Sequence, residues 1–400
     1  MFPVLIFLHA YIGARLLPDL PFGLVGLVIG IAWLVASAAL IPFGWGARRA
    51  APGAPAAWRM WAGLLAMGAF SSLFVLTFLR DVALLAALVA HAAFPDAIAL
   101  DAFVHASAVA VPLLALLLTA IGYANARRVA AVRRVDVPID ALPDALHGFT
   151  IAQITDVHVG PTIRRVDVEA IVDAVNALDA DLVAVTGDLV DGSVRHLARH
   201  VEPLARLASR HGSYFVTGNH EYYSGVHAWV VELRRLGLRV LLNEHVVIEH
   251  EGDRIVVAGV TDPSAHHFDP AHRSDPRSAL AGAPDDASLR VLLAHQPRSA
   301  FAAAEAGYQL QLSGHTHGGQ FLPWNFFVRL QQPFTAGLRR LGALWVYTSR
   351  GTGYWGPPSD SARRRRSRSC GSCARRNPRP AAIRRGPVAA VVRTASRDPR

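Results

Sequence analysis

Residues 308–320 read YQLQLSGHTHGGQ and join an alternating apolar and polar run to two histidines, His315 and His317, set among glycines. Alternation with period two is typical of a β-strand, and side chains two positions apart on a strand point to the same side. The two imidazoles can therefore face one point, and the glycines allow the close backbone approach of a tight loop. Taken alone, the stretch fits a metal site and a glycine-rich turn about equally well.

Short apolar runs like this one recur along the chain and alternate with helical patterns. Residues 167–178 and 228–236 carry apolar residues near helical spacing, as does the stretch that ends at Arg210. The strand candidates are residues 149–155, 182–187, 213–218, 254–260, 290–295, 308–314 and 344–349. Strand and helix alternation in the first half predicts an α/β fold with parallel strands, and the later strands predict a second sheet.

Polar residues of one kind stand where five of these runs end, in the motifs TDVH, GDLVD, GNHE, the single His295 and GHTH. Their side chains are those of Asp156, His158, Asp188, Asp191, Asn219, His220, Glu221, His295, His315 and His317. An α/β sheet places its functional loops at the carboxyl ends of its strands. We therefore expect these side chains to meet at one sheet edge.

The donor types in this set narrow the chemistry. Carboxylates, imidazoles and one amide without any thiolate suit Mn²⁺, Fe or Zn²⁺ rather than an iron–sulfur cluster. The imidazoles are too many for a magnesium or calcium site. The set also exceeds what one ion needs and fits two ions that share a carboxylate, an arrangement suited to phosphoryl transfer.

Taken in order, these five motifs resemble those of the calcineurin-like metallophosphoesterases over residues 148–356. The resemblance implies a sandwich of two sheets flanked by helices, in agreement with the strand and helix pattern. It also implies a metal-ligand set: Asp156, His158 and His317 on one ion, Asn219, His295 and His315 on the other, with Asp188 bridging the two. His220 is implied as the catalytic residue that protonates the leaving group or stabilises the transition state.

Two carboxylates of the motifs are excluded from the predicted ligands. We expect Asp191 to hold the GDLVDG turn and Glu221 to cap a helix or support the ligands. The remaining histidines of this region are interpreted as surface or loop residues, namely His196, His200, His211, His227, His266 and His267.

The first third of the chain is strongly apolar, and 52% of all residues are hydrophobic, which indicates membrane segments. We predict four spans: a short one at residues 1–17 and longer ones at 22–44, 61–79 and 102–123. The run 83–94 is too short to cross alone, and Arg80-Asp81 is expected to separate it from the preceding span.

Arginines predict the orientation of these spans. Arg48, Arg49 and Arg59 lie between the second and third predicted spans. Arg127, Arg128, Arg133 and Arg134 follow the last. Two spans separate the groups, so both lie on one side, which the positive-inside rule makes cytoplasmic. We expect a multi-pass protein of the inner (plasma) membrane with its catalytic domain in the cytoplasm.

The last forty residues hold thirteen arginines and one acid, Asp398, and carry more positive charge than the +10 of the whole chain. Both cysteines, Cys370 and Cys373, also lie there. The chain contains no lysine, as a GC-rich gene would encode, and a continuation typical of the resembled branch can yield DSARRRRSRSCG (360–371) in a shifted frame. We interpret the tail as a frameshift product and do not expect nucleic-acid binding.

The predicted domains are a transmembrane helical region at 1–125, a linker at 126–147, a metallophosphoesterase domain at 148–358 and a basic low-complexity tail at 359–400. The predicted partners are the bilayer and a phosphoester substrate, and no oligomeric state is predicted.

The sequence predicts a membrane-anchored hydrolase that uses two divalent metal ions, Mn²⁺ first and Fe or Zn²⁺ as alternatives, to cleave a phosphodiester or pyrophosphate bond. The resembled membrane branch is similar to enzymes that hydrolyse UDP-2,3-diacylglucosamine in lipid A biosynthesis, so a lipid-linked or nucleotide-sugar substrate is expected. The alternative is a catalytically silent membrane scaffold, against which stands the presence of a suitable residue at every ligand position.

Overall fold

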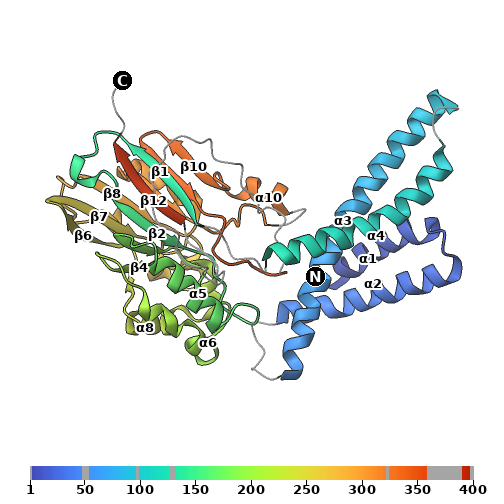
Figure 1. Cartoon of the computed structure of the whole chain (residues 1–400), viewed down its shortest axis with the longest axis horizontal. Coiled ribbons are helices and arrows are strands. Elements are labelled where there is room, and N and C mark those ends of the chain that lie inside the picture. The colour runs from blue at the N-terminus through green and yellow to red at the C-terminus, as the bar shows by residue number, and fades with distance from the viewer. Residues whose placement is uncertain are drawn as a thin grey trace, which may run out of the picture. The chain divides into compact units, whose positions relative to one another are not determined.

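The chain forms two compact units, one helical and one that contains two β-sheets (Figure 1). The helical unit comprises Met1–Arg127 with two short later segments, and the sheets lie in the other unit. The computed structural model describes residues 2–46, 54–95, 99–126, 132–320, 324–357 and 390–396.

The helical unit contains four described α-helices: α1 (Phe2–Leu16), α2 (Gly23–Gly46), α3 (Ala54–Ala93) and α4 (Leu100–Ala126). Three of them are long and apolar enough to cross a membrane, within Gly23–Gly44, Trp58–Ala93 and Leu100–Ala126. Helix α1 has 15 residues, fewer than the roughly 20 that a bilayer core requires. Among the described residues, three helices meet this length and composition, and the fourth predicted span, at residues 1–17, stays a prediction.

Helix α3 runs without a break through Arg80 and Asp81, so the expected separation at this pair is wrong. The guanidinium of Arg80 contacts the Asp19 carboxylate at 2.5 Å and donates to the carbonyl oxygen of Arg15 at 2.7 Å. Asp81 accepts hydrogen bonds from Arg15 Nε at 2.9 Å and Tyr11 Oη at 2.7 Å. Because both charges are paired within the helical unit, the apolar helix can continue past them.

The first sheet has six strands in the order β1-β12-β2-β3-β4-β5. Their bounds are β1 (Arg133–Ile139), β12 (Ala390–Ser396), β2 (Thr150–Ile154), β3 (Leu182–Val185), β4 (Ser213–Phe215) and β5 (Arg239–Val240). Strands β2 to β5 are parallel, as the alternation with helices predicts. The helices that follow these strands are α5 (Arg165–Asn176), α6 (Val194–Val201), α7 (Asn219–Ser224) and α8 (Val226–Arg235).

The second sheet also has six strands, in the order β10-β11-β9-β8-β7-β6. Their bounds are β10 (Gly337–Leu341), β11 (Leu344–Thr348), β9 (Leu310–Ser313), β8 (Leu289–Leu293), β7 (Asp253–Gly259) and β6 (Glu244–His250). Strands β7, β8, β9 and β11 are parallel, while β6 and β10 pair antiparallel at the two edges. Helix α9 (Ala300–Ala306) packs on this sheet, and α10 (Trp324–Gln331) lies between β9 and β10 in the chain.

One hydrophobic core lies between the two sheets. It joins Ile151 and Leu182 of the first sheet to Val257, Val291 and Leu310 of the second, and all five side chains are fully buried. Each fully buried aliphatic side chain contributes about 1.5–3 kcal/mol by leaving water. The predicted α/β sandwich of two sheets flanked by helices, preceded by apolar helices, is confirmed.

Strand β12 falls inside the range predicted as a low-complexity tail. It pairs parallel to β1 and antiparallel to β2, and Val392 is fully buried in the core between the sheets. The hydroxyl of Thr394 donates to the carbonyl oxygen of Leu146 at 2.6 Å. The apolar AVV run has strand propensity that two flanking strands can use. Residues 358–389, with Cys370 and Cys373, lie outside the described residues.

Replacing Val392 by Asp should destabilise the sheet unit, because the new carboxylate would be buried without a partner at a cost of about 3 kcal/mol or more. The measurement is thermal unfolding of the detergent-purified chain followed by tryptophan fluorescence. The matched control is Arg393→Ala on the same strand, whose side chain is half-exposed and pairs with Asp136 at 3.1 Å. Equal unfolding temperatures for Val392→Asp and the wild type would contradict the burial of Val392 in a strand between β1 and β2.

Candidate metal centre

The motif side chains gather where strands of both sheets end. Gln153, which is fully buried, connects the two ends by donating to the carbonyl oxygen of Ser313 at 3.0 Å and to Thr186 Oγ1 at 2.8 Å. The loops after β2, β3, β8 and β9 thereby meet at one edge, beside the start of α7. The predicted meeting of motifs at the carboxyl ends of strands is what the structure shows.

Five of the seven predicted ligands have a left-handed backbone. The φ angles are 53° at Asp156, 53° at His158, 52° at Asp188, 72° at His315 and 47° at His317. Residues other than glycine adopt this conformation at a cost of about 1–2 kcal/mol each. Such strain persists only where the surrounding structure enforces it, and it clusters at functional sites.

These turns correct the reasoning from strand periodicity. Strand β9 ends at Ser313, so His315 and His317 lie on a left-handed loop and not on an extended segment. Their side chains consequently do not face one point. They join two different groups of metal-ligating side chains.

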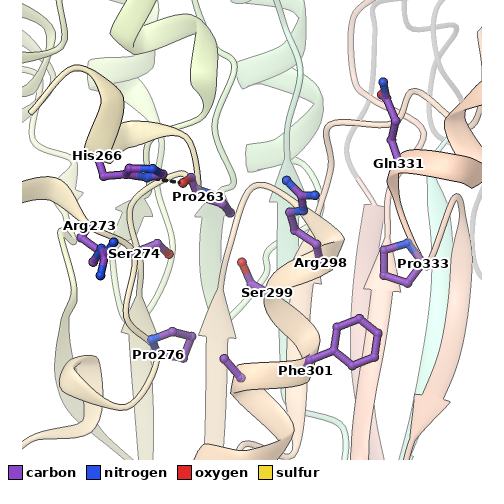
Figure 2. Close-up of a pocket in the computed structure, with 11 residues that line it drawn as sticks. Pro263, His266, Arg273, Ser274, Pro276, Arg298, Ser299, Phe301, Gln331 and Pro333 are labelled. Carbon is purple, nitrogen blue, oxygen red and sulfur yellow. Dashed lines mark hydrogen bonds between the residues drawn. The ribbon is translucent and has the colours of Figure 1, made fainter. Parts of the chain in front are cut away.

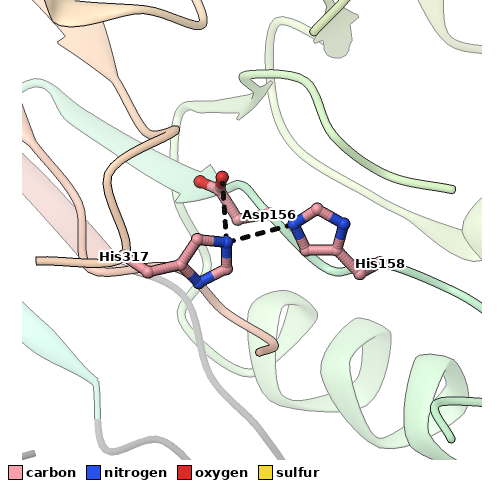
Figure 3. A group of neighbouring side chains, drawn as sticks. All are labelled: Asp156, His158 and His317. Atoms are coloured by element: carbon pink, nitrogen blue, oxygen red, sulfur yellow. Dashed lines mark hydrogen bonds and ion pairs between the residues drawn. The ribbon is translucent and has the colours of Figure 1, made fainter. Parts of the chain in front are cut away.

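The first group consists of Asp156, His158 and His317 (Figure 3). His158 Nε2 lies 3.1 Å from His317 Nε2, and the same His317 nitrogen lies 3.5 Å from Asp156 Oδ1. The backbone N–H of His315 donates to both carboxylate oxygens of Asp156, at 2.9 and 3.0 Å, and so holds that carboxylate in place.

The second group consists of Asp188, His295 and His315. His295 Nε2 lies 3.1 Å from Asp188 Oδ2 and 3.2 Å from His315 Nδ1. The other ring nitrogen of His295 bonds to the carbonyl oxygen of Thr186 at 2.8 Å, which orients Nε2 toward the group. The same Asp188 Oδ2 lies 3.9 Å from His158 Nε2 of the first group. One carboxylate oxygen therefore faces both groups.

The surroundings of Asn219 indicate whether metal cations fit between these two groups. It is 9% exposed, and its Oδ1 atom is buried with no hydrogen-bond partner among the described residues. An unsatisfied buried oxygen costs about 1–3 kcal/mol. Its neighbour His220 donates a backbone N–H to Asp188 Oδ1 at 2.9 Å, which places Asn219 beside the shared carboxylate. Carboxylate, imidazole and amide donors together fit divalent metal ions such as Mn²⁺, Fe²⁺ or Zn²⁺.

Residues 149–319 match the family model for calcineurin-like phosphoesterases. An uncharacterized metallophosphoesterase of Aquifex aeolicus is 32% identical over 229 residues, which cover 57% of this chain and 85% of that protein. The chain belongs to this family. Its members bind divalent metals, and the two side-chain groups are candidate ligand clusters for them.

Two further relatives extend the likeness. A Danio rerio protein named "Transmembrane protein with metallophosphoesterase domain" is 39% identical over 263 residues, covering 63% of this chain and 60% of that protein. An uncharacterized metallophosphoesterase of Campylobacter jejuni is 32% identical over 235 residues, covering 58% and 60%. The chain thus spans about three-fifths of the length of these two relatives.

In this metallophosphoesterase-family site, the ionisation of each buried group depends on the charges of its neighbours. Burial opposes ionisation of Asp188, but the His220 and His295 rings outweigh it and hold the pKa of that carboxyl well below its usual range. Burial raises the pKa of Asp156, and burial lowers the pKa of His317 well below its usual value. Two buried carboxylates ionise together only with positive charge nearby, which bound cations would supply.

Asp191 makes contacts beyond the turn-forming role expected for it. One oxygen, Oδ1, makes a short hydrogen bond with His220 Nδ1 and lies 3.4 Å from His158 Nδ1. Burial works against its ionisation, yet the charges of His220 and His158 hold the pKa of Asp191 far below its usual range. The sequence signal for these contacts is the position of Asp191, three residues after Asp188 in the same loop. Asp191 orients one predicted ligand and the predicted catalytic histidine together.

Glu221 is fully buried and binds only backbone donors among its described hydrogen bonds. Its Oε2 accepts from Gly218 N at 2.7 Å and Asp188 N at 3.0 Å, and its Oε1 accepts from Leu189 N at 2.8 Å. Burial, aided by the charge of Asp188, raises its pKa to about 7. These are the contacts of a capping residue that also positions the Asp188 loop.

Two glycines allow the loops to approach the carboxylates. A Cβ atom on Gly218 would lie 2.6 Å from the backbone nitrogen of Asp188 and closer still to Oδ1. A Cβ atom on Gly314 would overlap the carboxylate of Asp156. Only glycine fits at either position without displacing a candidate ligand.

The histidines predicted to lie on surfaces and loops stay outside both groups. His196 contacts Ser193, His200 contacts Arg165, and His266 contacts the carbonyl oxygen of Pro263. His211 bonds to His250, and His227 lies near Asp269 and His272 in a separate, more exposed cluster.

Replacing Asp191 by Asn should lower kcat or metal affinity about 10- to 100-fold, because the carboxylate that orients both imidazoles is lost. The measurements are kcat with bis(p-nitrophenyl) phosphate and metal content by elemental analysis. Asp173→Asn on α5 is the control, since that carboxylate is 64% exposed and pairs only with Arg206 among the described ion pairs. Wild-type kcat and metal content in Asp191→Asn would contradict the orienting role.

Proposed function

We propose that this chain is a membrane-anchored phosphoesterase that hydrolyses a phosphodiester or pyrophosphate bond with two divalent metal ions. The observation that carries the proposal is the placement of Asp188 Oδ2, which lies 3.1 Å from His295 Nε2 and 3.9 Å from His158 Nε2. A carboxylate shared between two ligand groups is what a two-metal phosphoesterase requires. Asn219 Oδ1, buried without a partner, adds a further donor.

Each ion would have its own ligands. Asp156, His158 and His317 would hold one, Asn219, His295 and His315 the other, and Asp188 would contact both. When bound, the ions would neutralise charge on the phosphoryl oxygens and make coordinated water more acidic. Mn²⁺ is the first choice, and Fe or Zn²⁺ suit the same donors.

His220 is proposed as the general acid. Its side chain is 8% exposed, its Nδ1 is held by the Asp191 carboxylate, and its Nε2 lies 3.8 Å from Asp188 Oδ2. A hydrogen bond at Nδ1 fixes the ring and directs Nε2 into the site. A proton held at Nε2 can then pass to the oxygen of the departing alcohol or nucleoside phosphate.

A lipid-linked or nucleotide-sugar substrate, such as UDP-2,3-diacylglucosamine, is proposed on two grounds. The described part of the chain includes three helices apolar and long enough to cross a membrane, and a relative is named a transmembrane protein. Anchoring keeps an active site near lipid-borne phosphates. We further propose the inner membrane, with the catalytic domain in the cytoplasm, because Arg48, Arg49 and Arg59 satisfy the positive-inside rule on that side.

The alternative function is a catalytically silent scaffold. In a scaffold, no metal would constrain the residues at the ligand positions. Every predicted ligand is instead buried or nearly buried, and five of them keep a strained backbone. Strain of this kind has no use in a scaffold, so hydrolysis is the function that we favour.

Replacing Asp188 by Asn should remove most metal binding, because the shared carboxylate loses its charge. Activity should fall by at least about 100-fold, the upper end of what loss of a supporting residue costs. The measurements are Mn²⁺-dependent hydrolysis of bis(p-nitrophenyl) phosphate and metal content, with Asp173→Asn as the control. A wild-type chain that binds no metal and is inactive would support the scaffold instead.

Replacing His220 by Ala should leave about two metal ions bound and slow turnover by roughly 100-fold or more for a poor leaving group, because its departure needs a proton. With the good leaving group p-nitrophenolate the loss should be smaller. The measurement compares kcat for p-nitrophenyl and unsubstituted phenyl diesters. Wild-type kcat of the Ala variant on the phenyl ester would exclude the acid role.

A further inference from the structure

Two histidines and one aspartate form a further group of metal-ligating side chains outside the candidate metal centre. They are His227 on α8 and, on the loop that follows β7, Asp269 and His272; together they are called the His227 group. One ligand atom of each residue lies within 4.8 Å of the other two. None of the three belongs to the motifs at the strand ends, so this group is independent of the ligands described above.

A single tight turn brings Asp269 and His272 together. Residues Pro270–His272 form a 3₁₀ turn, and Asp269 caps it by accepting the backbone N–H of Ala271 at Oδ1, at 2.9 Å. Side chains three positions apart lie one above the other on such a turn, and proline near its start has the φ angle that the turn needs. The other carboxylate oxygen, Oδ2, lies 3.9 Å from His272 Nε2.

The hydroxyl of Tyr222 fixes the ring of His272. It lies 2.9 Å from His272 Nδ1 and 3.4 Å from Thr217 Oγ1. A hydroxyl can accept from an imidazole N–H and donate to a second oxygen, and this arrangement places the His272 proton on Nδ1. The lone pair of Nε2 then faces Asp269 Oδ2. Histidines that bind metal ions are usually held in this way, by a hydrogen bond at the other ring nitrogen.

His227 completes the group from a different element. Its side chain is 74% exposed, and its Nε2 lies 3.4 Å from the same Asp269 Oδ2. Tetrahedral zinc with bonds of about 2.0–2.2 Å requires ligand atoms about 3.3–3.6 Å apart, whereas an octahedral ion with bonds of this length requires about 3 Å. The separations of 3.4 and 3.9 Å suit the tetrahedron, with a small inward movement of the His272 ring.

A surface ion pair is the other explanation of these contacts. Such a pair joins one imidazolium to one carboxylate, whereas here two imidazoles face a single carboxylate oxygen. The rings of His227 and His272 have centroids 5.4 Å apart, so protonating both would place like charges side by side. One divalent cation instead satisfies two neutral imidazoles and a carboxylate together, and imidazole is a preferred ligand of zinc.

The position of the His227 group connects the loop after β7 to the helices after β4. Phe268, next to Asp269, packs on Tyr222 and Tyr223, with ring centroids 5.7 and 5.6 Å apart. The ring of Tyr223 lies 5.4 Å from that of His220. An ion bound by the His227 group would therefore hold this aromatic layer against α7, the helix that carries His220.

Other side chains of the same loop have different surroundings. His266 and Arg273 line a pocket of about 670 Å³ (Figure 2). His266 Nδ1 lies 2.9 Å from the carbonyl oxygen of Pro263, as Figure 2 shows. The members of the His227 group are not among the described residues that line this pocket. His266 is thus a histidine of the same loop that lies outside the group.

We propose that His227, Asp269 and His272 bind one Zn²⁺ ion, with water as the fourth ligand, and that this ion ties the loop after β7 to α8. The site is separate from the two ions of the proposed phosphoesterase centre. Its role is to fix the loop, and no step of phosphoester hydrolysis passes through it.

The test is the zinc content of the detergent-purified full chain after equilibration with a small excess of Zn²⁺, measured by elemental analysis. His227→Ala and Asp269→Asn should each hold one zinc ion fewer per chain than the wild type, and His266→Ala should hold as many as the wild type. The His227 ring is exposed, and asparagine keeps an oxygen for the N–H of Ala271, so both ligand variants should fold. The difference between variants is the same whether the phosphoesterase centre holds two ions or none.

Two further measurements examine the support of the site and its effect on the loop. Tyr222→Phe should weaken zinc affinity about 10- to 100-fold in competition with a chelating dye, because the His272 ring loses its hydrogen bond. Zn²⁺ should also slow trypsin cleavage after Arg273, the exposed residue that follows His272, in the wild type but not in His227→Ala.

A zinc ion lost in both ligand variants, together with slower cleavage of the zinc-loaded wild type, supports the proposed site. Equal zinc content in the wild type and both ligand variants would overturn it, as would an equal loss of zinc in His266→Ala. Cleavage after Arg273 that Zn²⁺ does not slow would overturn the role of the ion in tying the loop to α8.

Discussion

The buried carboxylate of Asp188 is the group on which the rest of the site depends. Its oxygens face His295 and His158 from the two ligand groups, and its Oδ1 accepts the backbone N–H of His220 at 2.9 Å. The Glu221 carboxylate accepts a hydrogen bond from the backbone N–H of Asp188 at 3.0 Å. A charged carboxylate at this depth is stable only with positive charge beside it. The His295 and His158 rings lie beside it, and the left-handed turns and the close approach of Gly218 position the loops that carry these groups.

The two sheets make this arrangement possible because they bring together residues far apart in the chain. Asp156 and His315 are 159 positions apart, yet the backbone N–H of His315 binds the Asp156 carboxylate at 2.9 Å. The core between the sheets supplies the stability that holds the left-handed turns, each of which costs about 1–2 kcal/mol. Hydrophobic packing at one place thus supports strain at another, and function depends on both.

The surroundings of the metal centre divide into two roles. Asp191 lies on one side and contacts both His158, a proposed metal ligand, and His220, the proposed general acid. On the other side, Gln296 follows His295 in the chain and donates to the buried Asp262 carboxylate at 2.9 Å. The first side orients two site histidines, and the second fixes the loop that carries His295.

The sequence by itself determined the fold class and the candidate residues, because both depend on local chemistry. Strand and helix periodicity predicted two sheets, and the donor types at the strand ends predicted ligands for metal ions. Only the tertiary structure decided that left-handed turns, not an extended strand, carry His315 and His317, and that Asp191 contacts two histidines. It also decided that α3 passes Arg80, whose charge pairs with the distant Asp19, and that β12 enters the first sheet. The reason is common to all four cases. Backbone strain, ion pairs and strand partners depend on groups far away in the chain, and local sequence patterns do not indicate those groups.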